Sequence, residues 1–165
     1  ILPQRGSRVA LIDLKLVEEA GFFRRTLECA VVKLVCEKAA GKELSDDFVL
    51  ALKANLNLQD FYLENPAPDK LMELDNEFHH LLFSCVDKER CYRMCCDMGI
   101  HFDRIRHLAL HTVKELKIVG DHHDIFSAIC DGASDRAYAL MVAHLTRFEI
   151  DEKLIKNEYP EYFVN

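Results

Sequence analysis

Four residues from three separate segments have the chemistry to bind one metal ion together. They are Asp75 and His79 in LDNEFHHLLF, His122 in GDHHDIFSAI and His144 in LMVAHLTRF. Asp75 and His79 are four residues apart, so in a helix their side chains lie one above the other on the same face. Imidazole nitrogens and carboxylate oxygens are common ligands of divalent transition metals. The set therefore predicts one site of three histidines and one carboxylate, with zinc as the first candidate and nickel, manganese or iron as alternatives.

The neighbours of these residues predict that the site is buried. Apolar residues recur around it at helical spacings of three and four: Leu71, Leu74, Phe78, Leu81 and Cys85 in the first segment, Ile125, Phe126 and Ile129 in the second, and Ala137, Met141 and Phe148 in the third. Burying a carboxylate and several imidazoles costs several kcal/mol unless each has a partner. One divalent cation can serve as the partner of all four.

Two simpler interpretations stay open at this stage. A single histidine on an apolar face is more often a hydrogen-bonded core residue than a ligand, and an Asp/His pair four residues apart is often only a side-chain hydrogen bond. A thiolate site is a further alternative, because Cys91, Cys95 and Cys96 are clustered. The chain has no second paired CxxC, so core packing is the better account of those thiols.

The other histidines have predicted positions of their own. His107 and His111 are four residues apart but lie away from the apolar stripe, so we expect them to face water. We expect His80 and His123 to flank the site at the surface. His101 lies beside the stripe and could approach the site, but we expect a structural role for it.

Composition sets the frame for these residues. The chain has 165 residues, half of them hydrophobic, with six glycines, four prolines and no tryptophan, which favours a single all-α domain. The net charge of −7 argues against nucleic-acid binding by this part alone. No apolar run approaches the ~20 residues that span a bilayer, so we expect a cytoplasmic protein. Six of the seven cysteines occupy positions typical of buried thiols in a reducing compartment: Cys29, Cys36, Cys85, Cys91, Cys95 and Cys130.

Capping and breaking residues predict six or seven helices in an antiparallel bundle. The expected helices cover about 13–40, 45–62, 69–86, 88–111, 119–130 and 134–156. Ser45, Asp87 and Ser134 are the expected N-caps, and Gly99 is an expected bend in the fourth helix. The first ten residues, ILPQRGSRVA, stand apart as a short strand or linker, and 11–165 form the helical domain.

Several motifs in this order resemble one protein family. They are RRTLE at 24–28, D-x-x-x-H within LDNEFHH, DHHDIFSAI, and the A-x-x-x-M-x-x-H run ending at His144. The chain resembles, over about residues 11–155, the C-terminal effector-binding domain called FCD of the FadR subgroup of GntR-type bacterial transcription regulators. In that light ILPQRGSRVA resembles the last strand of the wing of a winged helix-turn-helix domain.

The resemblance implies a ligand-sensing function. The effector would be a small organic acid bound at the metal, with Arg24 of the RRTLE stretch, and less strongly Arg104 or Arg106, as the cationic partner of its carboxylate. The resemblance also implies a homodimer, which contacts operator DNA only through an N-terminal winged helix absent from these residues, and it implies no membrane partner.

The strongest rival is a metal-dependent helical-bundle enzyme. The chain lacks the paired Glu-x-x-His motifs of di-iron bundles and has no second acid suitably spaced for a general base, so we expect no catalysis. A metal-free bundle that acts only in protein interaction would bind no metal at all.

Overall fold

The structure is a computed structural model that describes residues 9–112 and 117–164, with the side chains of 110–112 and 147–153 left out. The described residues form seven α-helices and one short 3-10 helix: α1 (Leu14–Ala40), α2 (Asp46–Glu64), α3 (Pro68–Cys85), α4 (Glu89–Met98), α5 (Ile100–Thr112), α6 (Ile118–Cys130), α7 (Ser134–Glu158) and η1 (Pro160–Tyr162). The prediction of an all-α bundle is confirmed.

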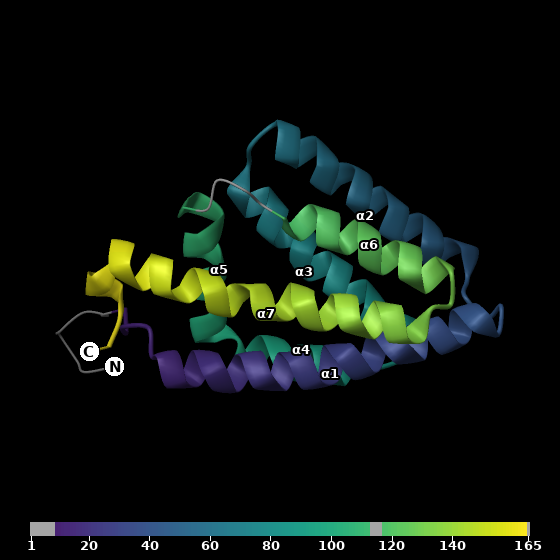
Figure 1. The fold of residues 1–165 in the computed structure, drawn as a ribbon, viewed down its shortest axis with the longest axis horizontal. Coiled ribbons are helices and arrows are strands. Elements are labelled where there is room, and N and C mark those ends of the chain that lie inside the picture. The colour runs from purple at the N-terminus through teal and green to yellow at the C-terminus, as the bar shows by residue number, and fades with distance from the viewer. Residues whose placement is uncertain (1–8, 113–116, 165) are drawn as a thin grey trace, which may run out of the picture.

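The two longest helices, α1 and α7, lie antiparallel and side by side along the length of the molecule (Figure 1). Helix α6 leads into α7 through a tight turn and packs against it, while α2 packs against both α3 and α6. Helix α5 contacts α1, α3 and α7 and lies at the end of the bundle where α1 begins and α7 ends. Each of the three helices that carry the predicted ligands therefore packs against at least two others.

Two apolar clusters hold the bundle together. The larger cluster joins α1, α2, α3, α6 and α7 and includes Val32, Leu52, Phe78, Ile125 and Met141. The smaller cluster lies at the terminal end and includes Ile12, Val17, Phe102, Ile105 and Phe163. Burial of such side chains stabilises a fold by about 1.5–3 kcal/mol each relative to leaving them exposed.

The capping residues predicted from the sequence are correct at one helix end and wrong at two others. Ser45 caps α2 as predicted, because its hydroxyl accepts a hydrogen bond of 3.2 Å from the Phe48 amide. Gly99 does more than bend a helix, since α4 ends before it and α5 begins after it. The prediction for Asp87 is wrong: its φ is 56°, and no side chain caps α4. The prediction for Ser134 is also wrong, because it is the first residue of α7 and makes no capping bond.

The buried face of α1 differs in part from the predicted one. Helical spacing in the sequence predicts a stripe along this segment of Leu16, Ala20, Phe23, Leu27, Val31, Leu34 and Lys38, but Leu16 and Leu34 are 43% and 38% exposed. Ala20 and Val31 are buried as predicted, and the helix also buries Val17, Glu28, Cys29, Val32, Val35 and Cys36. The buried face of α1 thus contains a carboxylate.

The seven cysteines are all free thiols. Cys29 and Cys36 are buried and Cys85 is half-buried, as expected for thiols that pack in a core, but Cys130 is exposed and that expectation is wrong. Of the segment 1–10, only Val9 and Ala10 are described, and they belong to no helix or strand. Among the described helices, none has the combination of length and apolar character that a membrane span needs.

Candidate metal centre

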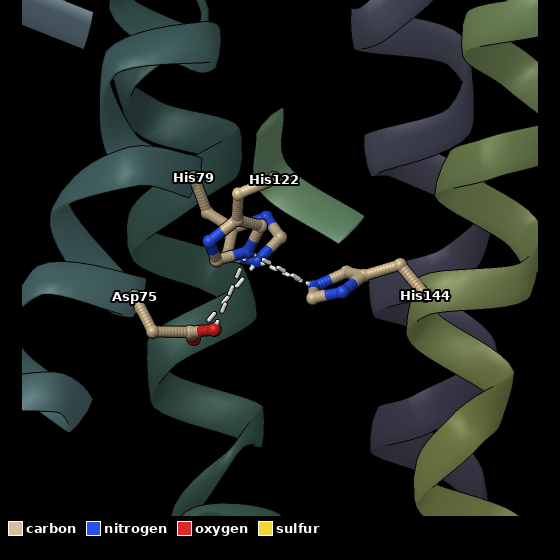
Figure 2. Close-up of side chains that lie close together, drawn as sticks. All are labelled: Asp75, His79, His122 and His144. Carbon is tan, nitrogen blue, oxygen red and sulfur yellow. Dashed lines mark hydrogen bonds and ion pairs between the residues drawn. The ribbon is translucent and has the colours of Figure 1, made fainter. Parts of the chain in front are cut away.

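The structure brings Asp75, His79, His122 and His144 together inside the bundle (Figure 2). Asp75 and His79 project from one face of α3, His122 from the first turns of α6 and His144 from the middle of α7. All four residues are buried, and one ligand atom from each lies within 4.8 Å of the others. Apolar residues three and four positions away turn these helix faces inward, so the polar side chains meet where the three helices converge.

The spacing of the ligand atoms matches a coordination sphere. His144 Nε2 lies 3.2 Å from His79 Nε2 and 3.3 Å from His122 Nε2. The Asp75 carboxylate oxygens lie 3.5 Å from His122 Nε2 and 3.9 Å from His79 Nε2. Ligands bound at about 2.0–2.1 Å to one metal are themselves separated by roughly 3–3.4 Å when they occupy neighbouring positions. The imidazole separations fall in this range.

Each of the three imidazoles has an acceptor at its other nitrogen. His79 Nδ1 is in close contact with the Oε2 atom of Glu28 in α1, and neither of these two buried atoms has a hydrogen-bond partner among the described residues. His122 Nδ1 lies 2.8 Å from Gln59 Oε1, and His144 Nδ1 lies 3.4 Å from Asp121 Oδ2. An acceptor beside Nδ1 assigns the ring proton to that nitrogen, which leaves the Nε2 lone pair for a metal.

Gln59 is itself held in a fixed orientation. Its amide nitrogen donates to Asn55 Oδ1 at 2.6 Å, which turns its oxygen toward His122. Asn55 in turn donates to the Leu74 carbonyl at 3.0 Å and to Glu77 at 2.8 Å. A chain of hydrogen bonds therefore runs from α3 through α2 to the ring of His122.

Three neutral imidazole lone pairs that converge on one point repel each other unless a cation lies between them. With every Nδ1 carrying the proton, none of the Nε2 atoms can donate to another. A divalent metal would remove this conflict and would also accept a carboxylate oxygen of Asp75. The donor set, the separations and the burial all fit such an ion.

Burial and charge keep these groups in metal-competent protonation states. Burial lowers the pKa of His79, and it lowers the pKa of His122 well below the ordinary value with the help of His144. Burial opposes ionisation of Asp75, but Arg106 and then His79 outweigh it and hold its pKa far below the usual range. Near neutral pH His79 and His122 are therefore neutral and Asp75 is ionised, as metal ligation requires.

Glu28 is a second buried carboxylate behind the histidines. Burial opposes its ionisation, but Arg24 and His79 outweigh that effect and lower its pKa to about 2. A carboxylate bonded to the outer nitrogen of a metal-binding histidine fixes the ring and raises its basicity. The charge of Glu28 is balanced by Arg24, whose Nε atom it also contacts.

The three arginines named from the sequence have different surroundings. The side chain of Arg24 is 13% exposed, and its Nη2 atom lies 3.9 Å from Asp75 Oδ2. Arg106 contacts Asp75 directly and also donates to Asn76 Oδ1 at 2.9 Å. Arg104 does not reach the metal centre: it donates to the Ala10 carbonyl at 2.7 Å and lines a surface cavity of about 450 Å³ near the termini.

The remaining histidines separate from the four-residue group. His80 and His123 are exposed at the surface, where they pair with Glu89 at 2.7 Å and Asp60 at 3.0 Å. His107 is half exposed, as expected, and the side chain of His111 lies outside the described part of the chain. His101 has a structural contact, because its Nδ1 accepts a hydrogen bond of 3.2 Å from the Asp13 amide.

Reasoning from the sequence missed the residues that orient the imidazoles, namely Glu28, Gln59 and Asp121. A signal was present for two of them. Glu28 ends the RRTLE motif, and Gln59 lies three positions beyond Leu56 and seven beyond Leu52 on the buried face of α2. Asp121 directly precedes His122 and looks like an ordinary acidic residue of a first helical turn.

Comparison with known proteins shows the family of the chain. Residues 19–147 match the FCD domain family, so the chain belongs to that family. The chain is 29% identical over 164 residues to the HTH-type transcriptional repressor RspR of Escherichia coli (strain K12), an alignment that covers 99% of this chain and 70% of the repressor. It is 28% identical over 167 residues to an uncharacterized HTH-type transcriptional regulator in an unstable DNA locus of Streptomyces ambofaciens, covering 99% of this chain and 66% of the relative.

The family resemblance drawn from the motifs is thereby confirmed. The chain is an FCD domain of the kind found in GntR-type transcriptional regulators, and FCD domains sense effectors. Its role is regulatory rather than enzymatic, because the domain is a regulatory one and the relatives are named as transcriptional regulators.

Proposed function

We propose that this domain senses a small organic acid at a buried divalent metal and so controls DNA binding by a FadR-type member of the GntR regulators. The observation that carries the proposal is the convergence of three Nε2 atoms, 3.2 and 3.3 Å apart, beside the carboxylate of Asp75. Each Nδ1 lies beside an acceptor of its own, which supports a cation between the rings rather than hydrogen bonds among them.

Different residues of the chain would have different roles in such a site. Asp75, His79, His122 and His144 would hold the metal, with zinc the first candidate for this donor set and nickel, manganese or iron suited to higher coordination numbers. The bound metal would supply positive charge and one or two coordination positions for a carboxylate or hydroxyl of the effector. Glu28 and Gln59 would keep two of the imidazoles in the binding tautomer.

Arg24 is the proposed partner of the effector's second polar end. Its side chain is largely buried, and Glu28 contacts its Nε atom, which directs the Nη2 atom toward Asp75. A planar guanidinium matches a carboxylate and can bind it through two parallel hydrogen bonds. Arg104, which lines the surface cavity, is not placed for this task.

The remaining parts of the proposal concern the whole regulator. Its relatives are named HTH-type regulators, which supports DNA contact through a winged helix outside residues 1–165, with residues 1–10 as the end of the wing and the linker. A homodimer would bring two such domains to a palindromic operator. The effector would then act by favouring one arrangement of the dimer over another.

A thermal unfolding experiment tests the sensing proposal. The chain is stripped with a chelator, loaded with zinc, and melted with a panel of small mono- and dicarboxylic acids. A ligand at 100 times its Kd stabilises by about 2.7 kcal/mol, which raises the Tm of a domain of this size by about 5–10 °C. At least one acid should do so with zinc present and not after chelation. Equal shifts with and without zinc, or no shift with any acid, would contradict the proposal.

Arg24→Met sharpens this test. The variant should bind zinc but lose most of the shift caused by the acid, because the metal ligands remain while the guanidinium is gone. His80→Ala is the matched control, since His80 neighbours a ligand in sequence yet pairs with Glu89 at the surface. The control should respond to zinc and acid as the unchanged chain does.

A further inference from the structure

Helix α5 contacts both the metal centre and the segment that precedes α1. Within six residues it presents Arg106 to Asp75, and it presents His101 and Arg104 to the backbone of residues 10–13. The helix is therefore positioned to transmit a change at Asp75 to the start of the domain.

Arg106 is fixed tightly at the metal-centre end. Its side chain is 14% exposed, and its Nη2 atom contacts Asp75 Oδ2. Its Nη1 atom donates to Asn76 Oδ1 at 2.9 Å and to Asp103 Oδ1 at 2.8 Å. The guanidinium thus joins two residues of α3 to α5, and it lies 5.9 Å from the centre of the Phe102 ring.

The other end of this connection is the segment Ala10–Asp13. His101 accepts a hydrogen bond of 3.2 Å from the Asp13 amide, and Arg104 donates to the Ala10 carbonyl at 2.7 Å. Between these contacts lies Ile12, which is buried against Phe102 and Ile105 of the same helix in the smaller apolar cluster.

Backbone hydrogen bonds tie Ile12 to the C-terminal end. The Ile12 amide donates to the Tyr162 carbonyl at 2.7 Å, and the Val164 amide donates to the Ile12 carbonyl at 2.9 Å. The hydrogen-exchange rates of these two backbone amides therefore measure the stability of the hydrogen bonds that hold the segment Ala10–Asp13 in place. Both can be followed by hydrogen exchange.

We infer that Arg106 is a positioning residue that couples the metal centre to segment Ala10–Asp13 through α5. The inference rests on the proposed metal centre. Asp75 carries one negative charge. A divalent metal that binds this carboxylate weakens the attraction between Asp75 and the Arg106 guanidinium, and the metal also repels the guanidinium. The release of Arg106 weakens the contact between α5 and α3. Because His101 and Arg104 lie on the same helix, their contacts with the segment Ala10–Asp13 weaken as well.

Hydrogen–deuterium exchange of the 165-residue chain, with and without zinc, tests this coupling. In the unchanged chain zinc should accelerate exchange of the Ile12 and Val164 amides by at least about threefold through local opening. Exchange in α3 and α7 should slow, because the metal joins these helices. A purely structural role of Arg106 would move both regions in the same direction.

Arg106→Met removes the guanidinium and keeps an apolar side chain. In this variant zinc should bind at least as tightly, since a neighbouring cation is gone, but should no longer accelerate exchange at Ile12 and Val164. His101→Phe provides a second route if the first variant fails to fold: it cuts the contact with Asp13 at the far end of the same helix and leaves the metal ligands intact. It should bind zinc normally and also lose the acceleration.

His107→Ala is the matched control on the same helix and should behave like the unchanged chain. If zinc binds the unchanged chain without accelerating exchange at Ile12 and Val164, the coupling is overturned while the metal centre stands. The same holds if Arg106→Met or His101→Phe keeps the full acceleration. If calorimetry shows no zinc binding to the unchanged chain, the metal centre is overturned and the coupling with it.

Discussion

Two adjacent histidine pairs, His79–His80 and His122–His123, each divide between the inside and the outside of the bundle. Successive residues of a helix are about 100° apart, so one member of each pair enters the core while its neighbour faces solvent. His79 and His122, with His144, are the inner histidines. His80 and His123 are the outer histidines, and each pairs with an exposed carboxylate.

The two groups use their ring nitrogens in opposite ways. The outer histidines direct Nε2 to their carboxylates, at 2.7 Å from Glu89 and 3.0 Å from Asp60. The inner histidines direct Nδ1 to acceptors and leave Nε2 pointing to a common centre. The same residue type therefore serves as a surface ion-pair partner in one group and as a candidate metal ligand in the other, and the nitrogen left open decides which.

The largest expected contrast comes from replacing His122 or its neighbour His123. His122→Ala removes a ligand, so its zinc affinity should fall by more than about 100-fold, beyond the roughly 10–100-fold loss typical when only an outer hydrogen-bond partner of a ligand is removed. His123→Ala should bind zinc like the unchanged chain. Competition with a chromogenic chelator measures both, and equal affinities would refute the division between inner and outer histidines.

A smaller contrast separates the carboxylates behind the two groups. Glu28→Gln keeps the shape of the side chain but removes the negative charge beside His79, so zinc affinity should fall by about 10–100-fold. Glu89→Gln makes the same change beside the outer His80 and should leave zinc affinity unaltered. The two variants are measured by the same competition, and a loss in both or in neither would count against a special role of Glu28.

The pH dependence of stability gives a third contrast. Burial lowers the pKa of His79 and His122, so in metal-free protein the unfolded chain takes up protons near pH 6.5 that the folded chain does not. Folding stability should therefore fall as the pH drops from 7 to 5, by up to about 1.4 kcal/mol per pH unit for each such histidine. Urea unfolding of chelator-treated protein measures this, and a stability that stays constant or rises toward pH 5 would contradict it.

The smallest expected effect belongs to the outer pairs. The side chains of His123 and Asp60 are 44% and 50% exposed, so solvent screens their attraction. Asp60→Asn should change the free energy of unfolding by less than about 1 kcal/mol. A loss of several kcal/mol in urea unfolding would show that this pair is as important to the fold as the buried contacts.

Much of the fold could be predicted because its signals are local. Asn65-Pro66 and Gly132 interrupt the apolar periodicity, so the ends of α2, α3, α6 and α7 lie within two or three residues of the expected ones. The inward direction of His79, His122 and His144 also follows from apolar residues on their own helices.

The errors come from features that depend on tertiary contacts. The prediction for the buried face of α1 is wrong at Leu16 and Leu34, because that face includes Glu28, and a pattern of apolar residues does not count the position where a buried ion pair lies. The position of Arg104 at the Ala10 carbonyl could not be predicted, because the orientation of α5 is set after the break at Gly99. Phe102 and Ile105 are the buried residues there, which places Arg106 on the inner face.

The partners of the imidazoles could not be predicted from periodicity. His122 and Gln59 are 63 residues apart, and His79 and Glu28 lie on different helices. Such contacts depend on how α1, α2, α3 and α6 pack together, which the pattern along any one helix does not contain.

Metal content tests the central claim most directly. The purified chain is loaded with zinc, freed of excess metal, and its zinc content is measured by elemental mass spectrometry. Two double variants are measured beside it: Asp75→Ala with His144→Ala, and His80→Ala with His123→Ala. The unchanged chain and the outer-histidine variant should each retain about one zinc per chain, as expected for a single site of four protein ligands, while the inner variant retains almost none. Equal zinc in all three proteins would contradict the account.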